Sequence, residues 1–248
     1  MKTTRIIGSY LSPYVRKVLV CLELKGIPYQ VDPIVPFYGN DEFSRVSPVR
    51  RIPVLINEEL TLADSTVICE YLDERFPLPA IFPHGPVNRA RARWLEEFAD
   101  SRMGEVLIWG LYNQVAIRRA VWNEPPDQEL LKKVYARDIP DLLNYLEGHV
   151  PQQGWIFDQF GIADISIATF FRNAQFSRFS IDVQIWPLTA AFVTRALAHW
   201  SFAKLRPFED LICRIPPAGQ RAALIAAGAP IDPQTMGVSD PRRGILKI

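Results

Sequence analysis

The chain has 248 residues, of which 48% are hydrophobic and 22% charged, with a formal net charge of +1. This length suits one large or two small domains, and the apolar share is enough for a sizeable core. A charge so close to zero gives no case for a nucleic-acid partner or for an anionic membrane surface.

The cysteines and the first residues bound the class of protein further. Cys21, Cys69 and Cys213 are far apart and fit neither zinc spacing nor a redox Cys-x-x-Cys pair, so no metal site is expected. Residues 6–8 are too short for the apolar region of a signal peptide, and no apolar run approaches membrane-spanning length. We therefore expect a reduced, cytoplasmic protein without a membrane partner, whose cysteines pack as small hydrophobes.

The first part of the chain alternates strand and helix patterns. Residues 4–9 predict a strand, after which Ser12 is a plausible N-cap with Pro13 at the first helical position. The apolar stripe that follows ends at Gly26, a good helix stop. Residues 28–35 predict a second strand, which a right-handed crossover makes parallel to the first.

The rest of this part completes a small mixed sheet. A short turn joins the third and fourth strands, so this pair is antiparallel. The order predicts a thioredoxin-like α+β domain over residues 1–80, with a mixed four-stranded sheet and three helices. Its remaining elements are a helix over 41–46, strands over 54–56 and 60–62, and a helix over 65–75 that Asp64 or Ser65 can cap.

The pattern becomes helical after a proline-containing linker at residues 81–85. We expect an all-α domain over residues 86–248, of which 215–248 is an extra C-terminal tail. Pro140 would lie inside a helix and predicts a kink or a break there. The expected helices are 86–122, 127–147, 161–176, 187–199, 201–214 and 218–227.

Several motifs in this order resemble those of the cytosolic glutathione transferases, over residues 4–214. The serine before Pro13 is most similar to tau- and theta-like and bacterial serine-type members. Two departures stand out: Gly161 replaces the usual Ser or Thr helix cap, and the tail extends the usual ending. The motifs are Ser12-Pro13-Tyr14, Arg51-Ile52-Pro53-Val54-Leu55, Asp64-Ser65, Gly161-Ile162-Ala163-Asp164, Trp186-Pro187 and Arg206-Pro207.

The resemblance implies glutathione as co-substrate and a set of residues that bind it. The backbone of Ile52, before a cis Pro53, would pair with the cysteinyl part of glutathione. Ser65 at a helix N-terminus would hold the γ-glutamyl carboxylate, with Asp64 near the ammonium group. Arg51 would face the glycyl carboxylate. The alternative is that Asp64 and Ser65 only cap a helix, that Pro53 is trans, and that Arg51 is only solvated.

By the same resemblance Ser12 is the catalytic residue. Thiolate is the nucleophile, and a free thiol titrates near 8.5. One hydrogen bond to the charged sulfur stabilises it by about 1.5–3 kcal/mol, or roughly one to two pKa units. Ser12 would donate that bond without attacking the substrate itself. Ser9 and Tyr10 are alternative donors, and Ser12 as a helix cap alone is the simpler interpretation.

A pocket for the second substrate is expected where the two domains meet. An apolar lining would suit a small apolar electrophile, although an apolar helical stripe is more often core. The candidate lining residues are Tyr10, Leu11, Tyr14, Met103, Leu107 and Leu111.

These features predict a glutathione transferase that acts as a homodimer. A non-catalytic binding or assembly module on the same fold is one alternative, since fold alone does not establish function. A specialised glutathione-dependent lyase, dehalogenase or isomerase is another. A thiol-disulfide oxidoreductase would need a cysteine where Ser12 stands.

Overall fold

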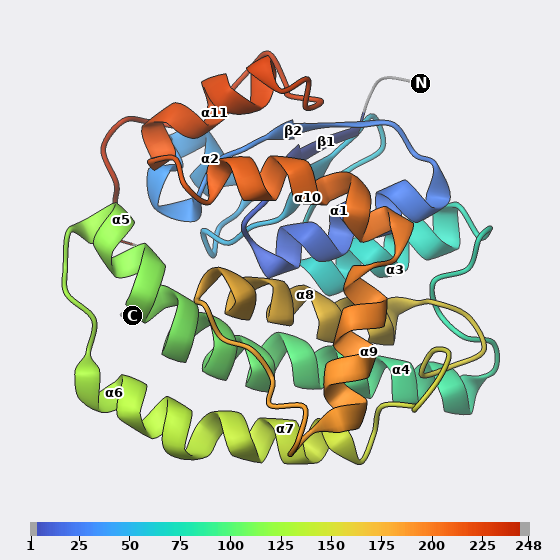
Figure 1. The fold of residues 1–248 in the computed structure, drawn as a ribbon. Helices are drawn as coiled ribbons and strands as arrows, with labels where there is room; N and C mark the ends of the chain where they lie inside the picture. Colours follow the sequence, from blue (N-terminus) through green and yellow to red (C-terminus); the bar gives the residue numbers. More distant parts are fainter. Residues whose placement is uncertain (1–3, 244–248) are drawn as a thin grey trace. The chain divides into compact units, whose positions relative to one another are not determined.

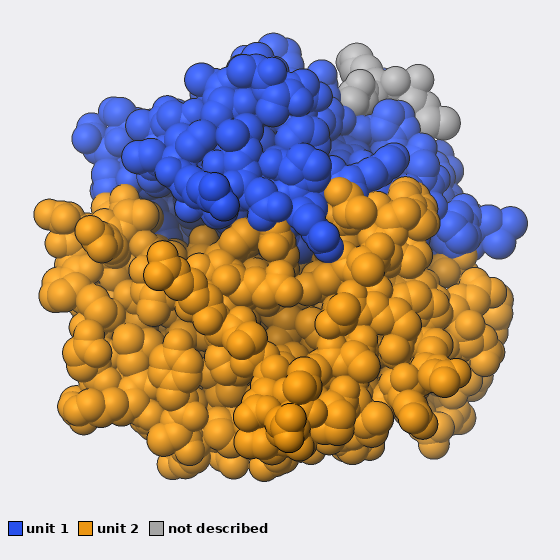
Figure 2. All heavy atoms as spheres, viewed as in Figure 1, with its two compact units in different colours: residues 1–79, 204–248 blue, residues 80–203 orange. Residues whose placement is uncertain are grey.

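The computed structural model describes residues 4–243, and Figure 1 shows its elements. The chain forms two compact units, coloured separately in Figure 2. The sheet unit holds residues up to 79 together with those from 204 onward, and the helical unit holds 80–203. The first division between the two units falls between Pro79 and Ala80. Residues from 204 onward, expected in the helical domain, belong instead to the sheet unit.

The sheet has four strands in the order β2-β1-β3-β4. The β1 and β2 strands are parallel, whereas β3 is antiparallel to both β1 and β4. This arrangement confirms the predicted thioredoxin-like mixed sheet. Pro33 follows β2 and has no N–H for the ladder, which explains why this strand is shorter than expected. The strands are β1 (Thr4–Ile7), β2 (Tyr29–Asp32), β3 (Val54–Ile56) and β4 (Thr61–Ala63).

The helices of the first part begin and end at the predicted residues. Ser12 caps α1 (Pro13–Lys25), which Gly26 ends in the left-handed conformation at a φ of 64°. The short η1 (Pro36–Tyr38) and α2 (Asp41–Val46) follow β2, and α3 (Ser65–Arg75) follows β4.

Two lysines tie α1 to α3. Lys17 is fully buried, and its Nζ donates to Thr66 Oγ1 at 3.2 Å, in the first turn of α3. Lys25 Nζ donates to Asp73 Oδ1 at 3.0 Å, in the last turns of the same helix. Between these ties Cys21 and Cys69 are buried, as predicted.

The helical unit opens with one continuous helical stretch. It comprises α4 (Pro86–Phe98), the π-helical η2 (Ala99–Ile117) and α5 (Arg118–Trp122), which matches the predicted span. The next stretch runs through α6 (Gln128–Lys133), the π-helical η3 (Val134–Asp138) and α7 (Ile139–Glu147). Pro140, where a kink or break is expected, lies in the first turn of α7, which directly follows the π-helical η3.

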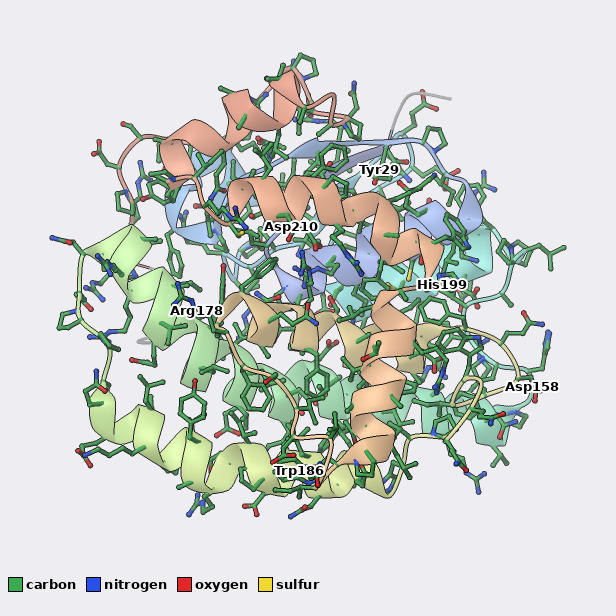
Figure 3. All side chains as sticks on the ribbon, in the orientation of Figure 1. Tyr29, Asp158, Arg178, Trp186, His199 and Asp210 are labelled. Carbon is green, nitrogen blue, oxygen red and sulfur yellow. The ribbon has the colours of Figure 1, made fainter. Side chains whose placement is uncertain are left out.

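The helical unit continues with α8 (Ile162–Phe176) and α9 (Pro187–Leu197). Trp186, labelled in Figure 3, precedes α9 and donates from Nε1 to Asn144 Oδ1 at 2.8 Å. Further along the chain come α10 (Trp200–Ile212) and α11 (Pro217–Ala226). Within residues 4–243, no helix combines the length and apolar character needed to cross a membrane.

Candidate functional site

Three loops of the sheet unit adjoin one row of residues across the sheet. Ile7, the last residue of β1, pairs with Val54, the first of β3, and Val54 pairs with Ala63, the last of β4. Asp32, the last residue of β2, pairs with Ile7 on its other side. We call these four residues the terminal row. Ser12 and Asp64-Ser65 follow this row in the chain, whereas Ile52-Pro53 leads into it. Neighbouring strands lie about 4.8 Å apart, so all three segments adjoin one end of the sheet.

Gly8 lets the loop after β1 pack closely against its neighbours. Its φ is 149°, and a Cβ there would lie 2.4 Å from Val15 Cγ2 and 3.1 Å from Ile52 Cβ. Only glycine fits both this backbone conformation and this space. Gly8 is not among the site residues predicted from the sequence. The available signal was a glycine directly after a strand and before a loop.

Ser12 is the N-cap of α1, as predicted. Its Oγ accepts a hydrogen bond from Val15 N at 3.4 Å, and the side chain is half-buried. A hydroxyl that accepts one hydrogen bond keeps its own O–H for donation. Ser12 can therefore cap α1 and at the same time donate a hydrogen bond to a thiolate.

The two alternative donors are enclosed. Ser9 is buried, and its Oγ accepts from Leu11 N at 3.2 Å. Tyr10 has no exposed surface, its ring lies 5.6 Å from that of Phe208, and its hydroxyl has no hydrogen-bond partner within the described residues. Burial, followed by the nearby charge of Glu23, raises the pKa of Tyr10 far above its ordinary value. These environments favour Ser12 as the donor.

A buried guanidinium holds the loop between β1 and α1. Arg16 is fully buried and donates from Nη2 to the carbonyl oxygen of Tyr10 at 3.4 Å. Its Nε forms an ion pair with Glu209 of α10, itself 3% exposed. Neither residue was foreseen from the sequence, because α10 lies far along the chain.

The Ile52–Pro53 peptide bond is cis, as predicted. A second cis bond, Leu78–Pro79, was not foreseen. The residue before Ile52 is held by its backbone: Ser47 Oγ accepts from Arg51 N at 2.9 Å and donates to Arg51 O at 2.8 Å. The Arg51 side chain is exposed, so its charge can reach a ligand.

The Arg50 side chain is engaged in hydrogen bonds within the protein. Its φ is 51°, and its Nη2 donates to the carbonyl oxygens of Pro36 at 3.1 Å and Gly39 at 2.9 Å. Its Nη1 hydrogen-bonds Ser44 Oγ. Arg50 therefore connects the loop of the cis proline to the segment after β2.

Asp64 caps α3, as predicted. Its Oδ1 accepts from Thr66 N at 2.9 Å and from Val67 N at 3.3 Å. Its φ of 89° is costly for a residue other than glycine, and such strain clusters at functional sites. Ser65, the first residue of α3, is 3% exposed. Asp64 occupies the N–H groups of Thr66 and Val67, so the backbone N–H and the hydroxyl of Ser65 are the groups of this helix N-terminus to consider for an anion.

The expected pocket residues divide by burial. Leu11 and Tyr14, which flank Ser12, are half-buried and keep exposed surface. The other four have no exposed surface, which favours the core interpretation for them; they are Tyr10, Met103, Leu107 and Leu111. Within residues 4–243, no group of three or more His, Cys, Asp or Glu side chains is arranged to hold a metal ion.

Comparisons with known proteins show which proteins this chain is similar to. Residues 6–80 match the family model of the glutathione S-transferase N-terminal domain. The chain is 28% identical to the uncharacterized GST-like protein YibF of Escherichia coli K12 over 208 residues, 82% of this chain and 98% of the relative. It is 28% identical to maleylacetoacetate isomerase of Pseudomonas aeruginosa over 206 residues, 80% and 93% of the two chains. A glutathione S-transferase structure from Rhodospirillum rubrum F11 superposes with a TM-score of 0.78 at 24% identity, over 88% of this chain and 98% of that one.

Proposed function

Because the chain belongs to the cytosolic glutathione S-transferase superfamily, we propose that it is a glutathione transferase acting on a small apolar electrophile. The terminal row is the observation that carries the proposal. It gathers Ser12, Ile52-Pro53 and Asp64-Ser65 at one end of the sheet. Each of these segments offers a group that a different part of glutathione requires.

The γ-glutamyl end of glutathione binds at α3 in this proposal. The carboxylate lies against the backbone N–H and the hydroxyl of Ser65, where the helix macrodipole favours an anion. The ammonium group lies near the carboxylate of Asp64, which the cap at Thr66 and Val67 holds in place. The strain at Asp64 supports this assignment over capping alone, because capping does not require a positive φ.

The rest of the tripeptide binds along the cis-proline loop. The backbone N–H and C=O of Ile52 pair with the cysteinyl residue. The exposed side chain of Arg51 faces the glycyl carboxylate, while Ser47 holds the Arg51 backbone. A backbone fixed in advance lowers the ordering cost of binding.

Ser12 donates its hydroxyl hydrogen bond to the sulfur of glutathione. This bond and the positive end of α1 both favour thiolate over thiol. The thiolate then attacks the electrophile, the new bond forms at sulfur, and the electron pair leaves with the displaced group or resides on the product. Ser12 itself forms no covalent bond.

Conjugation assays with a panel of electrophiles test this function. Ser12→Gly removes the hydroxyl while costing the helix cap only a few tenths of a kcal/mol, whereas Ser12→Thr keeps both hydroxyl and cap. We expect Ser12→Gly to lower the rate near neutral pH by about tenfold or more and Ser12→Thr to retain more of it. Full activity of Ser12→Gly would contradict the role of Ser12.

An isomerase is the second candidate. It rests on the similarity to maleylacetoacetate isomerase, which extends over 93% of that protein. The same activated thiolate serves addition and isomerisation, so cis-trans isomerisation of an unsaturated substrate belongs in the screen. A protein that retains no glutathione would point to the binding or assembly module instead. The expected cytoplasmic location and homodimer remain part of this proposal.

A further inference from the structure

The chain after α11 turns back and follows the edge strand of the sheet. We call residues 229–242 the strap. Val31 N of β2 donates to Pro230 O at 2.7 Å, and Asp232 N donates to Val31 O at 3.0 Å. Ile231 thereby forms a parallel bridge with Val31. The strap therefore covers the outer edge of β2, where backbone groups would otherwise be unpaired.

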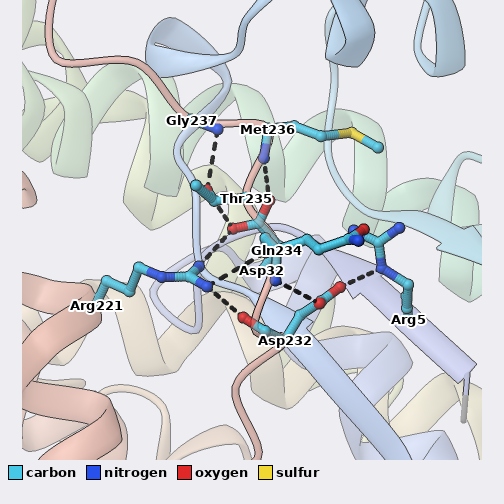
Figure 4. Close-up of polar contacts among 8 residues, drawn as sticks. All are labelled: Arg5, Asp32, Arg221, Asp232, Gln234, Thr235, Met236 and Gly237. Atoms are coloured by element: carbon cyan, nitrogen blue, oxygen red, sulfur yellow. Dashed lines mark hydrogen bonds and ion pairs between the residues drawn. The ribbon is translucent and has the colours of Figure 1, made fainter.

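Asp32 anchors the strap in the terminal row (Figure 4). This carboxylate has no exposed surface. It accepts hydrogen bonds from Arg221 Nη1 at 2.9 Å, Thr235 Oγ1 at 2.8 Å and Met236 N at 2.7 Å. Charge-assisted bonds of this kind are about twice as strong as neutral ones. An ion pair between Arg5 of β1 and Asp232 adds a second attachment.

Beyond Asp32, the strap holds the segment of residues 37–41. Asn40 N donates to Met236 O at 2.8 Å, and Val238 N donates to Tyr38 O at 2.8 Å. Arg242 contributes twice, from its backbone N to Phe37 O at 2.6 Å and from Nη1 to Asp41 Oδ1 at 2.6 Å. The segment is thus fixed along its whole length.

Arg50 also contacts this segment, together with Pro36 directly before it. Its guanidinium donates to the carbonyls of Pro36 and Gly39, at 3.1 and 2.9 Å. Arg50 immediately precedes Arg51 and Ile52 in the chain. Hydrogen bonds and the short stretches of backbone between them therefore connect the strap, through residues 36–41, to the cis-proline loop.

We propose that the strap is a positioning element of the glutathione site, which sets the affinity for glutathione by holding the loop of Arg51 and Ile52 in its binding conformation. This inference rests on the proposed function and adds a role for a segment that lies outside the site itself. Loosening the strap frees residues 36–41, and with them Arg50 and the loop that it supports. Glutathione must then order that loop as it binds, which weakens binding.

Two variants test the proposal. The first ends the chain after Gly228 and so removes the strap while keeping α11. The second, Arg242→Ala, breaks one exposed ion pair of the strap, with 51% of the Arg242 side chain accessible. Arg75→Ala is the matched control, because Arg75 forms an ion pair with Glu59 in the same unit and is 47% exposed.

Calorimetry with glutathione and steady-state kinetics give the first result. We expect the dissociation constant and the KM for glutathione to rise about fivefold in the truncated chain and by a smaller factor in Arg242→Ala. The kcat at saturating glutathione should stay within about twofold, because Ser12 is untouched. Arg75→Ala should have the same dissociation constant, KM and kcat as the wild-type protein. Equal affinity in all variants would overturn the proposal.

Amide hydrogen exchange separates this proposal from the proposed function. We expect faster exchange at Asn40 and also at Arg51, whose N–H is bonded to Ser47 Oγ. A strap that only shields the sheet edge would change Asn40 and leave Arg51 unaltered, which would overturn the positioning role. If the unchanged chain binds no glutathione, the proposed function fails, yet exchange at Arg51 still decides the strap. If the truncated chain does not fold, Arg242→Ala supplies both measurements.

Discussion

Gly161 shows how one missing side chain accounts for a departure from the expected motif. Its φ is −152°, an extended conformation open to any residue. Space is the reason for glycine, because a Cβ would lie 2.5 Å from the carbonyl oxygen of Ile81. The same carbonyl accepts a hydrogen bond from Ile162 N at 2.8 Å. The chain thus replaces a side-chain cap with a close backbone approach.

Gly161→Ser should therefore destabilise the protein, although serine is a good N-cap elsewhere. We expect a loss of about 1–3 kcal/mol of unfolding free energy from the forced backbone shift. Urea unfolding measures it. Gly148→Ser is the control, because a Cβ there would lie 3.7 Å from its nearest neighbour, an ordinary contact. If both variants lose the same small amount, the steric explanation is wrong.

Asp164 gives a prediction about pH. Burial raises the pKa of this carboxyl to about 6, against hydrogen bonds from the N–H groups of Ile156 and Gly161 that lower it. The folded protein therefore holds a proton that the unfolded chain releases near pH 4. The contribution of Asp164 to stability is present below the unfolded pKa and is lost as the pH rises through the folded pKa.

The test measures the free energy of unfolding of the wild-type protein and of Asp164→Asn, each at about pH 4 and at about pH 7. Asparagine cannot titrate, and both proteins share all other titratable groups. The pH dependence from those groups therefore cancels in the difference between the two proteins. We expect the stability advantage of aspartate to shrink by up to about 3 kcal/mol on going to the higher pH. An advantage that stays constant or grows with pH would mean that the carboxyl is not perturbed upward.

Single residues also mark the limit of prediction from sequence. Ser12, Asp64 and the cis Pro53 were foreseen because local motifs, recognised by resemblance, carry them. Gly8 and Arg16 were not foreseen, because their roles depend on partners far along the chain. Gly8 meets Ile52, and Arg16 meets Glu209 in α10.

At the scale of elements, α1 and α3 carry the site at their N-termini and are tied at both ends. Lys25 closes the C-terminal tie, with 0% of its side chain exposed, against Asp73 at 7%. Its Nζ also donates to the carbonyl oxygens of Phe76 at 2.6 Å and Pro79 at 2.9 Å. The amphipathic pattern predicted both helices, yet it gave no sign that charged residues of α1 are buried between them.

Replacing Lys25 tests the strength of this tie. Lys25→Met removes a buried cation from the Asp73 carboxylate, and we expect a loss of about 3 kcal/mol. Lys204→Met is the control: Lys204 pairs with Glu23 at 2.7 Å but is 60% exposed, so we expect a change below about 1 kcal/mol. Thermal or urea unfolding compares them. Similar losses in both variants would show that burial does not set the strength of the tie.

At the scale of the whole chain, the thioredoxin-like sheet and the run of helices after residue 80 followed from the order of the patterns. The position of the C-terminal tail could not be predicted from these patterns. Its strap has no helical or strand period, and its attachment depends on single contacts such as those of Asp32 and Arg221. Residues from 204 onward therefore joined the sheet unit against expectation.

The proposed chemistry depends on a glutathione thiolate stabilised at Ser12. The pKa of the bound glutathione thiol, measured by ultraviolet difference spectroscopy of the thiolate, tests this most directly. We expect a value roughly one to two units below that of free glutathione in the unchanged protein, and the loss of most of this shift in Ser12→Gly. If the thiol bound to the wild-type protein titrates like that of free glutathione, the proposed role of Ser12 is contradicted.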